Sequence, residues 1–238
     1  MIAPSEQITG EPLQFLQVTN LRKAFLMGGT ELTVVDVQHF NLFAGDQIAI
    51  FGKSGSGKST FLNLLAGTLR PDSGSIIIKE TDLTVLSESE RDRMRSRNLG
   101  YVFQSFHLLQ GCTALENILV AMAVAGVANE ERAKELLSLV GLSEKESSLP
   151  SQLSIGQQQR VCIARALANK PKLILADEPT GSLDPENATR SIKLLQSLCD
   201  QNGCALIVVS HDPNIINCFE NSIKWEDLNK VGESFNES

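Results

Sequence analysis

The stretch GKSGSGKST, residues 52–60, decides how the rest of the chain is interpreted. It lies between QIAIF, an apolar run typical of a buried strand, and FLNLLAGTL, which has helical spacing. Its glycines let the backbone fold back on itself, and the helix that follows presents free N–H groups at its N-terminus. The ammonium group of Lys58 adds a positive charge at the same place. The stretch therefore predicts a binding pocket for polyphosphate.

The same residues fit the pattern G-x-x-x-x-G-K-[ST] of phosphate-binding loops. In this pattern the loop backbone surrounds the phosphates, Lys58 reaches the β- and γ-phosphates, and the hydroxyl of Ser59 binds Mg²⁺. A flexible Gly/Ser turn is the alternative, and the position between a strand and a helix argues against it. The predicted nucleotide-binding residues of the loop are Gly52, Lys53, Ser54, Gly55, Ser56, Gly57, Lys58, Ser59 and Thr60.

Two carboxylates end a second apolar strand, LILADEP at residues 173–179. If this strand is a neighbour of the strand that enters the phosphate loop, Asp177 lies beside the loop and holds the magnesium ion through water. Glu178 points to the other side of the strand end, where a carboxylate can polarise a water molecule for attack on the γ-phosphate. A solvated acidic pair that merely closes a strand is the alternative, and the phosphate loop weakens it.

Strand-like runs alternate with helical patterns along most of the chain, which predicts an α/β fold with a mostly parallel sheet. Between about 105 and 165 the signals are mainly helical, so we expect an inserted helical subdomain there. We predict a single domain at 12–228, with flexible tails at 1–11 and 229–238.

Composition and charge exclude several classes of protein. Hydrophobic residues make up 42% of the 238 residues, which is enough for a packed core. The formal net charge of −7 argues against bulk binding of nucleic acid, because that work usually needs a basic protein. The longest nearly unbroken apolar run, ILVAMAVAGVA at 118–128, is too short to span a bilayer. We therefore expect a protein that is soluble by itself. The run itself is expected to form core of the helical insert, or in part to border a groove for a membrane partner.

A third motif, LSIGQQQR at residues 153–160, begins about 20 residues before the strand that ends in the two carboxylates. With this motif the chain resembles the ABC ATPases, whose signature motif it matches, over about residues 13 to 212. The resemblance implies a P-loop NTPase core that binds and hydrolyses ATP with Mg²⁺. It also implies an antiparallel β subdomain at the N-terminus and a helical subdomain inserted in the core.

Other marks of the family follow in the same order. Gln104 ends YVFQ at the Q-loop position, where it would touch magnesium and the attacking water and link the core to the helical insert. Phe25 occupies the place of the aromatic residue that stacks on adenine. His211 follows the strand ALIVVS at the switch-histidine position and would contact the γ-phosphate and hold Glu178. The D-loop residues are Ser182, Leu183 and Asp184.

The signature residues imply a dimer. Ser154 and Gly156 begin a helix whose positive end can bind a γ-phosphate, but they lie far along the chain from the phosphate loop. In the family, the signature of one subunit closes on the nucleotide of the other, so a second copy of this chain is the expected partner. The signature residues are Ser154, Ile155, Gly156 and Gln157.

The sequence departs from the family pattern at several points. Ile155 replaces a glycine that is usual in the signature, and a helical backbone at this position would tolerate it. Phe25 replaces the commoner tyrosine, which keeps the stacking surface and loses a hydroxyl group. After His211 the family runs to an Asp-Gly turn between two last strands, whereas this chain reads NCFENSIKWEDLNKV at 217–231.

Within the family, YVFQSFHLL…TALENI and PTGSLD are similar to the lipoprotein-releasing, macrolide-export and cell-division (FtsE) group. This resemblance implies a membrane permease with an extracytoplasmic domain as partner, a location on the cytoplasmic face of the inner membrane, and export or extraction of a lipophilic cargo. An importer of a small solute and a nucleotide-gated scaffold remain alternatives. A soluble ATPase that works on DNA or ribosomes is less favoured, because the chain has one cassette and no heptad run.

Overall fold

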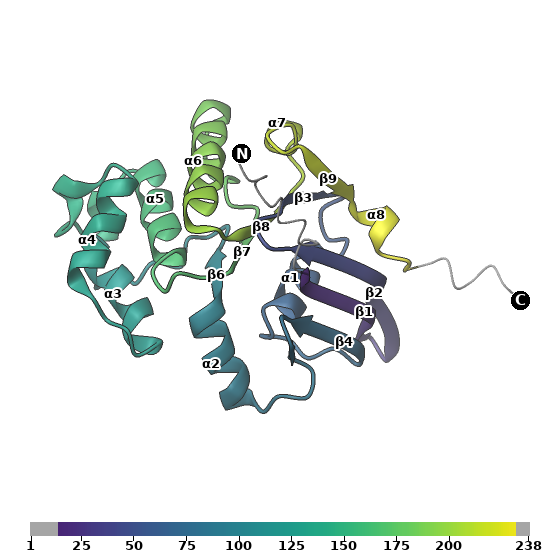
Figure 1. The fold of residues 1–238 in the computed structure, drawn as a ribbon. Helices are drawn as coiled ribbons and strands as arrows, with labels where there is room; N and C mark the ends of the chain where they lie inside the picture. The colour runs from purple at the N-terminus through teal and green to yellow at the C-terminus, as the bar shows by residue number, and fades with distance from the viewer. Residues whose placement is uncertain (1–13, 232–238) are drawn as a thin grey trace, which may run out of the picture.

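The structure is a computed structural model, and residues 14–231 are described here. The tail predicted at residues 1–11 lies outside the described residues, as does most of the tail predicted at 229–238. Figure 1 shows two sheets at the centre and right of the molecule, with a lobe of helices on the left.

The first sheet is antiparallel and has the strand order β2-β1-β4-β5. Strands β1 and β2 pair from Gln14↔Phe43 to Met27↔Thr30, around a turn made by Gly28 and Gly29. Alternate residues of β1 such as Leu16 and Val18 are fully buried, which is the period-2 pattern of a sheet with one face on the core. The expected antiparallel N-terminal subdomain is confirmed. Its strands are β1 (Gln14–Met27), β2 (Thr30–Phe43), β4 (Ser73–Ile78) and β5 (Thr81–Asp82).

The second sheet is parallel and has the strand order β6-β7-β8-β3-β9. All six residues of β8 are buried, as expected of a central strand that is covered on both faces. The mostly parallel α/β core is therefore confirmed. Its strands are β3 (Gln47–Phe51), β6 (Leu99–Val102), β7 (Leu173–Asp177), β8 (Ala205–Ser210) and β9 (Asn221–Lys224).

One premise of the sequence analysis is wrong. Strand β7, which ends in Asp177, is not a neighbour of β3, which leads into the phosphate loop, because β8 lies between them. Helix α1 (Lys58–Leu65) contacts β7, and this helix carries Ser59 to the carboxyl end of β7. The approach of the loop to Asp177 therefore depends on the helix that follows the loop rather than on adjacent strands.

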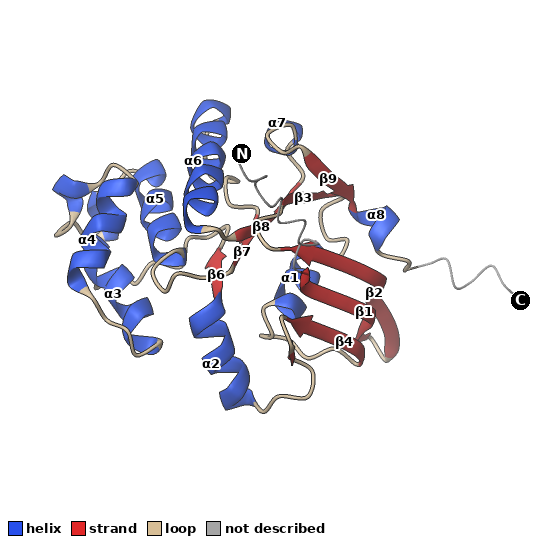
Figure 2. Cartoon of the chain, in the orientation of Figure 1, coloured by secondary structure: helices blue, strands red, loops and turns tan. Residues whose placement is uncertain are grey.

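The predicted helical insert is a lobe of three helices joined to the parallel sheet by a continuous apolar core (Figure 2). In the apolar run 118–128, Ile118 and Met122 are buried, whereas Val124 is 74% exposed. The run is thus core on one face only. The helices of the lobe are α3 (Ala114–Val124), α4 (Glu130–Leu139) and α5 (Ile155–Ala166), with 3₁₀ turns at Ser143–Lys145 and Pro150–Gln152. No helix within residues 14–231 is both long and apolar enough to cross a membrane.

The remaining helices are α2 (Glu88–Asn98), α6 (Pro185–Asn202), α7 (Pro213–Ile216) and α8 (Trp225–Leu228). In α2, Arg91 is buried and paired with Glu88, and Arg95 is paired with Asp92. Two of the four arginines of this helix therefore form ion pairs, and α2 does not present them as one basic patch.

The segment at 217–231 after His211, where the sequence has no Asp-Gly turn, forms a strand and a short helix. Strand β9 joins the far edge of the parallel sheet, and the short helix α8 follows it at once. The predicted tail begins with residues that hydrogen-bond to β2: the side chain of Asn229 donates to the carbonyl of Val34 (3.0 Å), and the N–H of Lys230 donates to the carbonyl of Asp36 (2.7 Å).

Candidate active site

The phosphate loop closes around the side chain of its own lysine. Lys58 is the first residue of α1 and is only 5% exposed. Its ammonium group donates hydrogen bonds to the carbonyl oxygens of Gly52 (2.8 Å) and Lys53 (2.6 Å). Burial lowers the pKa of Lys58, and the negative charges of nearby carboxylates, first Glu178, partly offset this. The amine is therefore held at the loop with its charge poorly solvated, which favours an anionic ligand.

Two glycines of the loop are required because neighbouring atoms leave no room for a side chain. Gly57 has φ 104°, and a Cβ atom there would lie 2.6 Å from the carbonyl oxygen of Val34. At Gly52 a Cβ atom would lie 2.9 Å from the Cβ of Trp225. The predicted residues Lys53, Ser54 and Gly55 are exposed at the tip of the loop.

Ser59 and Asp177 meet at the N-terminus of α1. The hydroxyl of Ser59 donates a hydrogen bond to the Asp177 carboxylate at 2.9 Å. Burial raises the pKa of Asp177, and the hydrogen bond from Ser59 opposes the shift. A hydroxyl and a carboxylate held together are oxygen ligands of the kind that Mg²⁺ uses beside a nucleotide, so this pair fits the ion. Gln104, also predicted to reach magnesium, is exposed, and its amide nitrogen lies 3.2 Å from where a Cβ on Gly181 would stand.

Glu178 and His211 lie within hydrogen-bonding distance of each other, directly after the ends of β7 and β8. The Oε1 atom of Glu178 lies 2.7 Å from Nδ1 of His211, and the hydroxyl of Ser210 donates to Oε2 at 3.3 Å. Glu178 has φ 44°, a left-handed conformation that costs a non-glycine residue about 1–2 kcal/mol. His211 is 62% exposed at its side chain while Glu178 is 16% exposed, so the pair opens to solvent on the histidine side.

The signature residues begin helix α5 as predicted. Ser154 is its N-cap, with its hydroxyl accepting the N–H of Gln157 (3.3 Å). Ile155 is the first helical residue, lies outside the set of residues with positive φ, and is 51% exposed. The condition for tolerating isoleucine here, a helical backbone, is met. A Cβ atom on Gly156 would meet no heavy atom within 4 Å.

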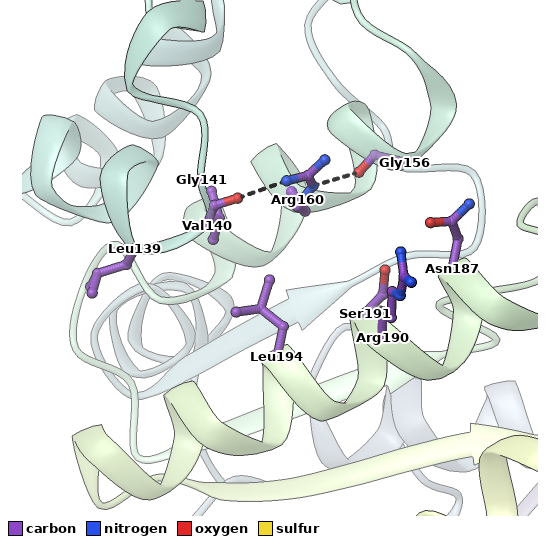
Figure 3. Close-up of a pocket in the computed structure, with 9 residues that line it drawn as sticks. All are labelled: Leu139, Val140, Gly141, Gly156, Arg160, Asn187, Arg190, Ser191 and Leu194. Atoms are coloured by element: carbon purple, nitrogen blue, oxygen red, sulfur yellow. Dashed lines mark hydrogen bonds between the residues drawn. The ribbon is translucent and has the colours of Figure 1, made fainter.

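Figure 3 shows Gly156 beside a pocket between α5 and α6, where Arg160 donates to the carbonyl oxygens of Gly156 (3.4 Å) and Val140 (3.2 Å). Among the described residues, no hydrogen bond joins the signature residues 153–157 to the phosphate loop 52–60.

Three residues of the site were not identified from the sequence. Gln159, buried on α5, donates to the carbonyl of Pro179 (2.7 Å) and so ties the signature helix to the residue after Glu178. Ser210 holds the second oxygen of Glu178. Trp225 donates its indole N–H to the carbonyl of Ser56 (2.7 Å) in the phosphate loop. Of these contacts, only that of Gln159 could have been suspected from the sequence, because Gln159 lies in the polar run QQQR at 157–160.

The other predicted residues lie at the edges of the site. Phe25 is 38% exposed on β1, with the ammonium group of Lys23 5.5 Å from the centre of its ring. In the D-loop, Ser182 is exposed, Leu183 packs on the core, and Asp184 caps α6 by accepting the N–H of Asn187 (3.1 Å).

Comparisons with known proteins identify the family of the chain. The family described as ABC transporter matches residues 35–181, more than half of the chain. The lipoprotein-releasing system ATP-binding protein LolD of Treponema denticola is 44% identical over 210 residues, covering 87% of this chain and 93% of that protein. The macrolide export ATP-binding/permease protein MacB of Syntrophobacter fumaroxidans is 38% identical over 220 residues, which cover 90% of this chain and 31% of that longer protein.

Among solved structures, the dimeric post-hydrolysis state of the ATP-binding cassette MJ0796, bound to ADP and Pi, superposes with a TM-score of 0.81. It is 35% identical in sequence, and the match covers 91% of this chain and 95% of that one. The phosphate loop, the paired carboxylates and the capped signature helix of this chain thus occur on the fold of an ATP-binding cassette. The chain belongs to the ABC transporter family and is an ATP-hydrolysing subunit of that family.

Proposed function

We propose that two copies of this chain close on ATP and that closure and hydrolysis drive a separate membrane permease, for export or for release of lipoproteins or another lipophilic cargo. The 44% identity to the lipoprotein-releasing ATP-binding relative supports release of lipoproteins. The 38% identity to the macrolide export ATP-binding/permease relative supports a permease as partner and export as the direction of transport. We place the chain at the cytoplasmic face of the inner membrane, bound to a permease that has an extracytoplasmic domain.

The observation that carries the proposal is the open space over Gly156. This residue has no positive φ and no neighbour that a Cβ would strike, so its own chain does not need glycine there. The close approach of a group from outside the chain explains why glycine occupies this position. Because the free N–H groups of a helix N-terminus attract phosphate, the γ-phosphate of ATP on a second subunit is the approaching group. The solved relatives described as dimeric cassettes fit this arrangement.

The proposed roles follow from the contacts. Lys58 binds the β- and γ-phosphates with the loop backbone, and Ser59 with Asp177 would hold Mg²⁺, which supplies positive charge to the phosphate oxygens when bound. Glu178 accepts a proton from the attacking water. His211 keeps the Glu178 carboxylate in place through their 2.7 Å contact. Gln104, against Gly181, carries the state of the site to the helical lobe.

A groove between α2, β6 and α3 supports docking of an apolar segment of the permease. Its lining includes Tyr101 and Phe103, which stack with ring centroids 4.1 Å apart, and the exposed side chain of Val124. The groove adjoins Gln104, which follows Phe103 in the chain. Movement of the Q-loop would therefore displace residues that line the groove and contact a bound permease.

The proposal is tested by the variant Glu178→Gln beside the native chain. Neutralising the proton acceptor removes hydrolysis but leaves ATP as a bridge, so we expect at least a 100-fold loss of turnover, of the size that loss of general-base catalysis produces, and a stable dimer with ATP. Phosphate release and native mass with and without ATP are the readouts, and exposed Glu144→Gln is the matched control. If Glu178→Gln hydrolysed ATP at the native rate and formed no dimer, the nucleotide-gated scaffold would become the favoured alternative.

The trapped Glu178→Gln dimer also serves to identify the cargo. We expect it to retain the permease from detergent-solubilised membranes of the source cell. The permease and this chain, reconstituted in liposomes, should then release a lipid-anchored protein only with ATP. Release of no lipid-anchored protein, together with uptake of a small solute, would favour the importer alternative.

A further inference from the structure

Helix α8 lies against the backbone of the phosphate loop. The indole N–H of Trp225 donates to the carbonyl of Ser56 at 2.7 Å, and Glu226 Oε1 accepts the N–H of Lys53 at 3.4 Å. A Cβ atom on Gly52 would lie 2.9 Å from the Cβ of Trp225 and 3.2 Å from Glu226 Oε2. Two consecutive residues of α8 therefore contact three residues of the loop. These contacts occur in the segment that departs from the family pattern.

The carboxylate of Glu226 is placed in an unusual way for a charged group. Its Oε2 atom is shielded from solvent and has no hydrogen-bond partner among the described residues. A hydrogen bond from its own N–H lowers the pKa of Glu226, and the N–H of Lys53 and the charges of Lys224 and Lys53 act in the same direction. The group is therefore ionised at neutral pH, and its negative charge is fixed directly on the loop that receives phosphate.

We propose that Glu226 is a positioning residue that weakens the hold of the phosphate loop on ATP, by fixing a negative charge against the backbone of Gly52 and Lys53. The inference rests on the proposed placement of the ATP phosphates on residues 52–60. Glu226 also faces Lys58 closely enough to favour its charged form. The repulsion between Glu226 and the nucleotide outweighs this favourable effect on Lys58, because the nucleotide carries several negative charges and Lys58 carries one positive charge.

The consequence is faster exchange of nucleotide. A loop that bound ATP and ADP with full strength would hold the product after hydrolysis, and the dimer would reopen slowly. One charge acting on a triphosphate across a partly solvated loop changes the dissociation constant by about three- to tenfold at low ionic strength.

The chain carries its own probe for the test. Trp225 is the single tryptophan of the sequence, and its indole is bound to the loop, so its fluorescence reports ATP binding there. ATP is titrated with EDTA present, which prevents hydrolysis, into the native chain and Glu226→Gln. Glutamine keeps the acceptor for Lys53 and removes the charge. Asp227→Asn is the matched control, because Asp227 is the exposed neighbour on the same helix.

We expect Glu226→Gln to bind ATP about three- to tenfold more tightly at low salt and the difference to shrink at about 500 mM salt, while Asp227→Asn stays near the native value. Equal or weaker binding by a folded Glu226→Gln would overturn the inference. Should Glu226→Gln fail to fold, Glu226→Ala, which also removes the charge, must show the same tightening. Lys58→Ala separates the two proposals: if it binds ATP normally, the placement of the phosphates is wrong, whatever Glu226 does.

Discussion

A methyl group on Gly156 tests the dimer most sharply, because the structure predicts opposite effects on stability and on activity. The Cβ of Gly156→Ala would have no heavy atom within 4 Å, and the residue lies in the first turn of α5 without positive φ. Replacing glycine with alanine in a helix stabilises a protein by about 0.5–1 kcal/mol. For a chain of this size that corresponds to a rise in Tm of about 1–4 °C.

The same methyl group stands where the γ-phosphate of the partner's ATP is proposed to approach the backbone N–H of this turn. Losing one such donor typically costs a factor of about 100 or more in turnover, and we expect hydrolysis to fall by at least that much. Thermal unfolding without nucleotide and steady-state release of phosphate measure the two effects. In the Glu178→Gln background, the added methyl group should also abolish the ATP-dependent dimer.

Gly111→Ala is the matched control, because Gly111 also has an ordinary φ and open space over its Cα but lies in the loop before α3. It should leave hydrolysis unchanged. A fall in the Tm of Gly156→Ala would show that the chain itself needs this glycine. Native hydrolysis by Gly156→Ala would show that nothing approaches the signature helix closely, and the sandwich arrangement would be refuted.

Two further predictions concern the edges of the site. Partial burial favours the neutral form of Asp72, but hydrogen bonds from Lys23 and the N–H of Ala24 outweigh it and lower the pKa of Asp72. Asp72→Asn should therefore lower the Tm at pH 7 by a few degrees at most, because the pair is half-exposed. The difference should begin to shrink as the pH falls below about 4, where the carboxylate of the unfolded chain is protonated, and should vanish at the lower pH at which the folded carboxylate is protonated too. A difference as large at pH 2 as at pH 7 would contradict this. His211→Ala should lower turnover at least tenfold while the Tm changes by less than about 2 °C, since the exposed imidazole contacts Glu178 but little of the core; native turnover would remove His211 from the mechanism.

The phosphate loop could be predicted from the sequence because its causes are local. The glycines, Lys58 and the start of the helix that follows lie within nine residues, and the ammonium group of Lys58 binds the carbonyl oxygens of Gly52 and Lys53 in the same segment. The close approach of Val34 and Trp225 to the loop glycines is a further requirement that no local pattern indicated. Ser154 at the N-cap of α5 was predictable for the same reason, since capping involves residues three apart.

Other features could not be predicted because they depend on residues far apart in the sequence. Strand order is one, since no local pattern indicated that β8 would separate β7 from β3. The contact of Arg95 with the carbonyl oxygen of Gly67, at 3.0 Å and 28 positions away, is another, because four arginines in seven residues have the same local pattern on a solvated face. The contact of Trp225 with Ser56 joins residues 169 positions apart, and WEDL carries no recognisable motif.

Two of the departures from the family pattern, Ile155 and the C-terminal segment, have a common consequence at the nucleotide. Ile155 lies on the signature surface that would face the partner's ATP, and α8 lies against the loop that would hold the chain's own ATP. A bulky exposed side chain on one face adds apolar contact to a closed dimer, whereas a fixed carboxylate on the other weakens the hold on each nucleotide. Together they would make closure of the dimer depend less on the affinity for ATP and more on contact between the subunits. Ile155→Gly in the trapped Glu178→Gln background should then weaken the dimer. It should leave the affinity for ATP, measured by Trp225 fluorescence, unchanged. A change in that affinity would show that Ile155 does not act through contact between subunits.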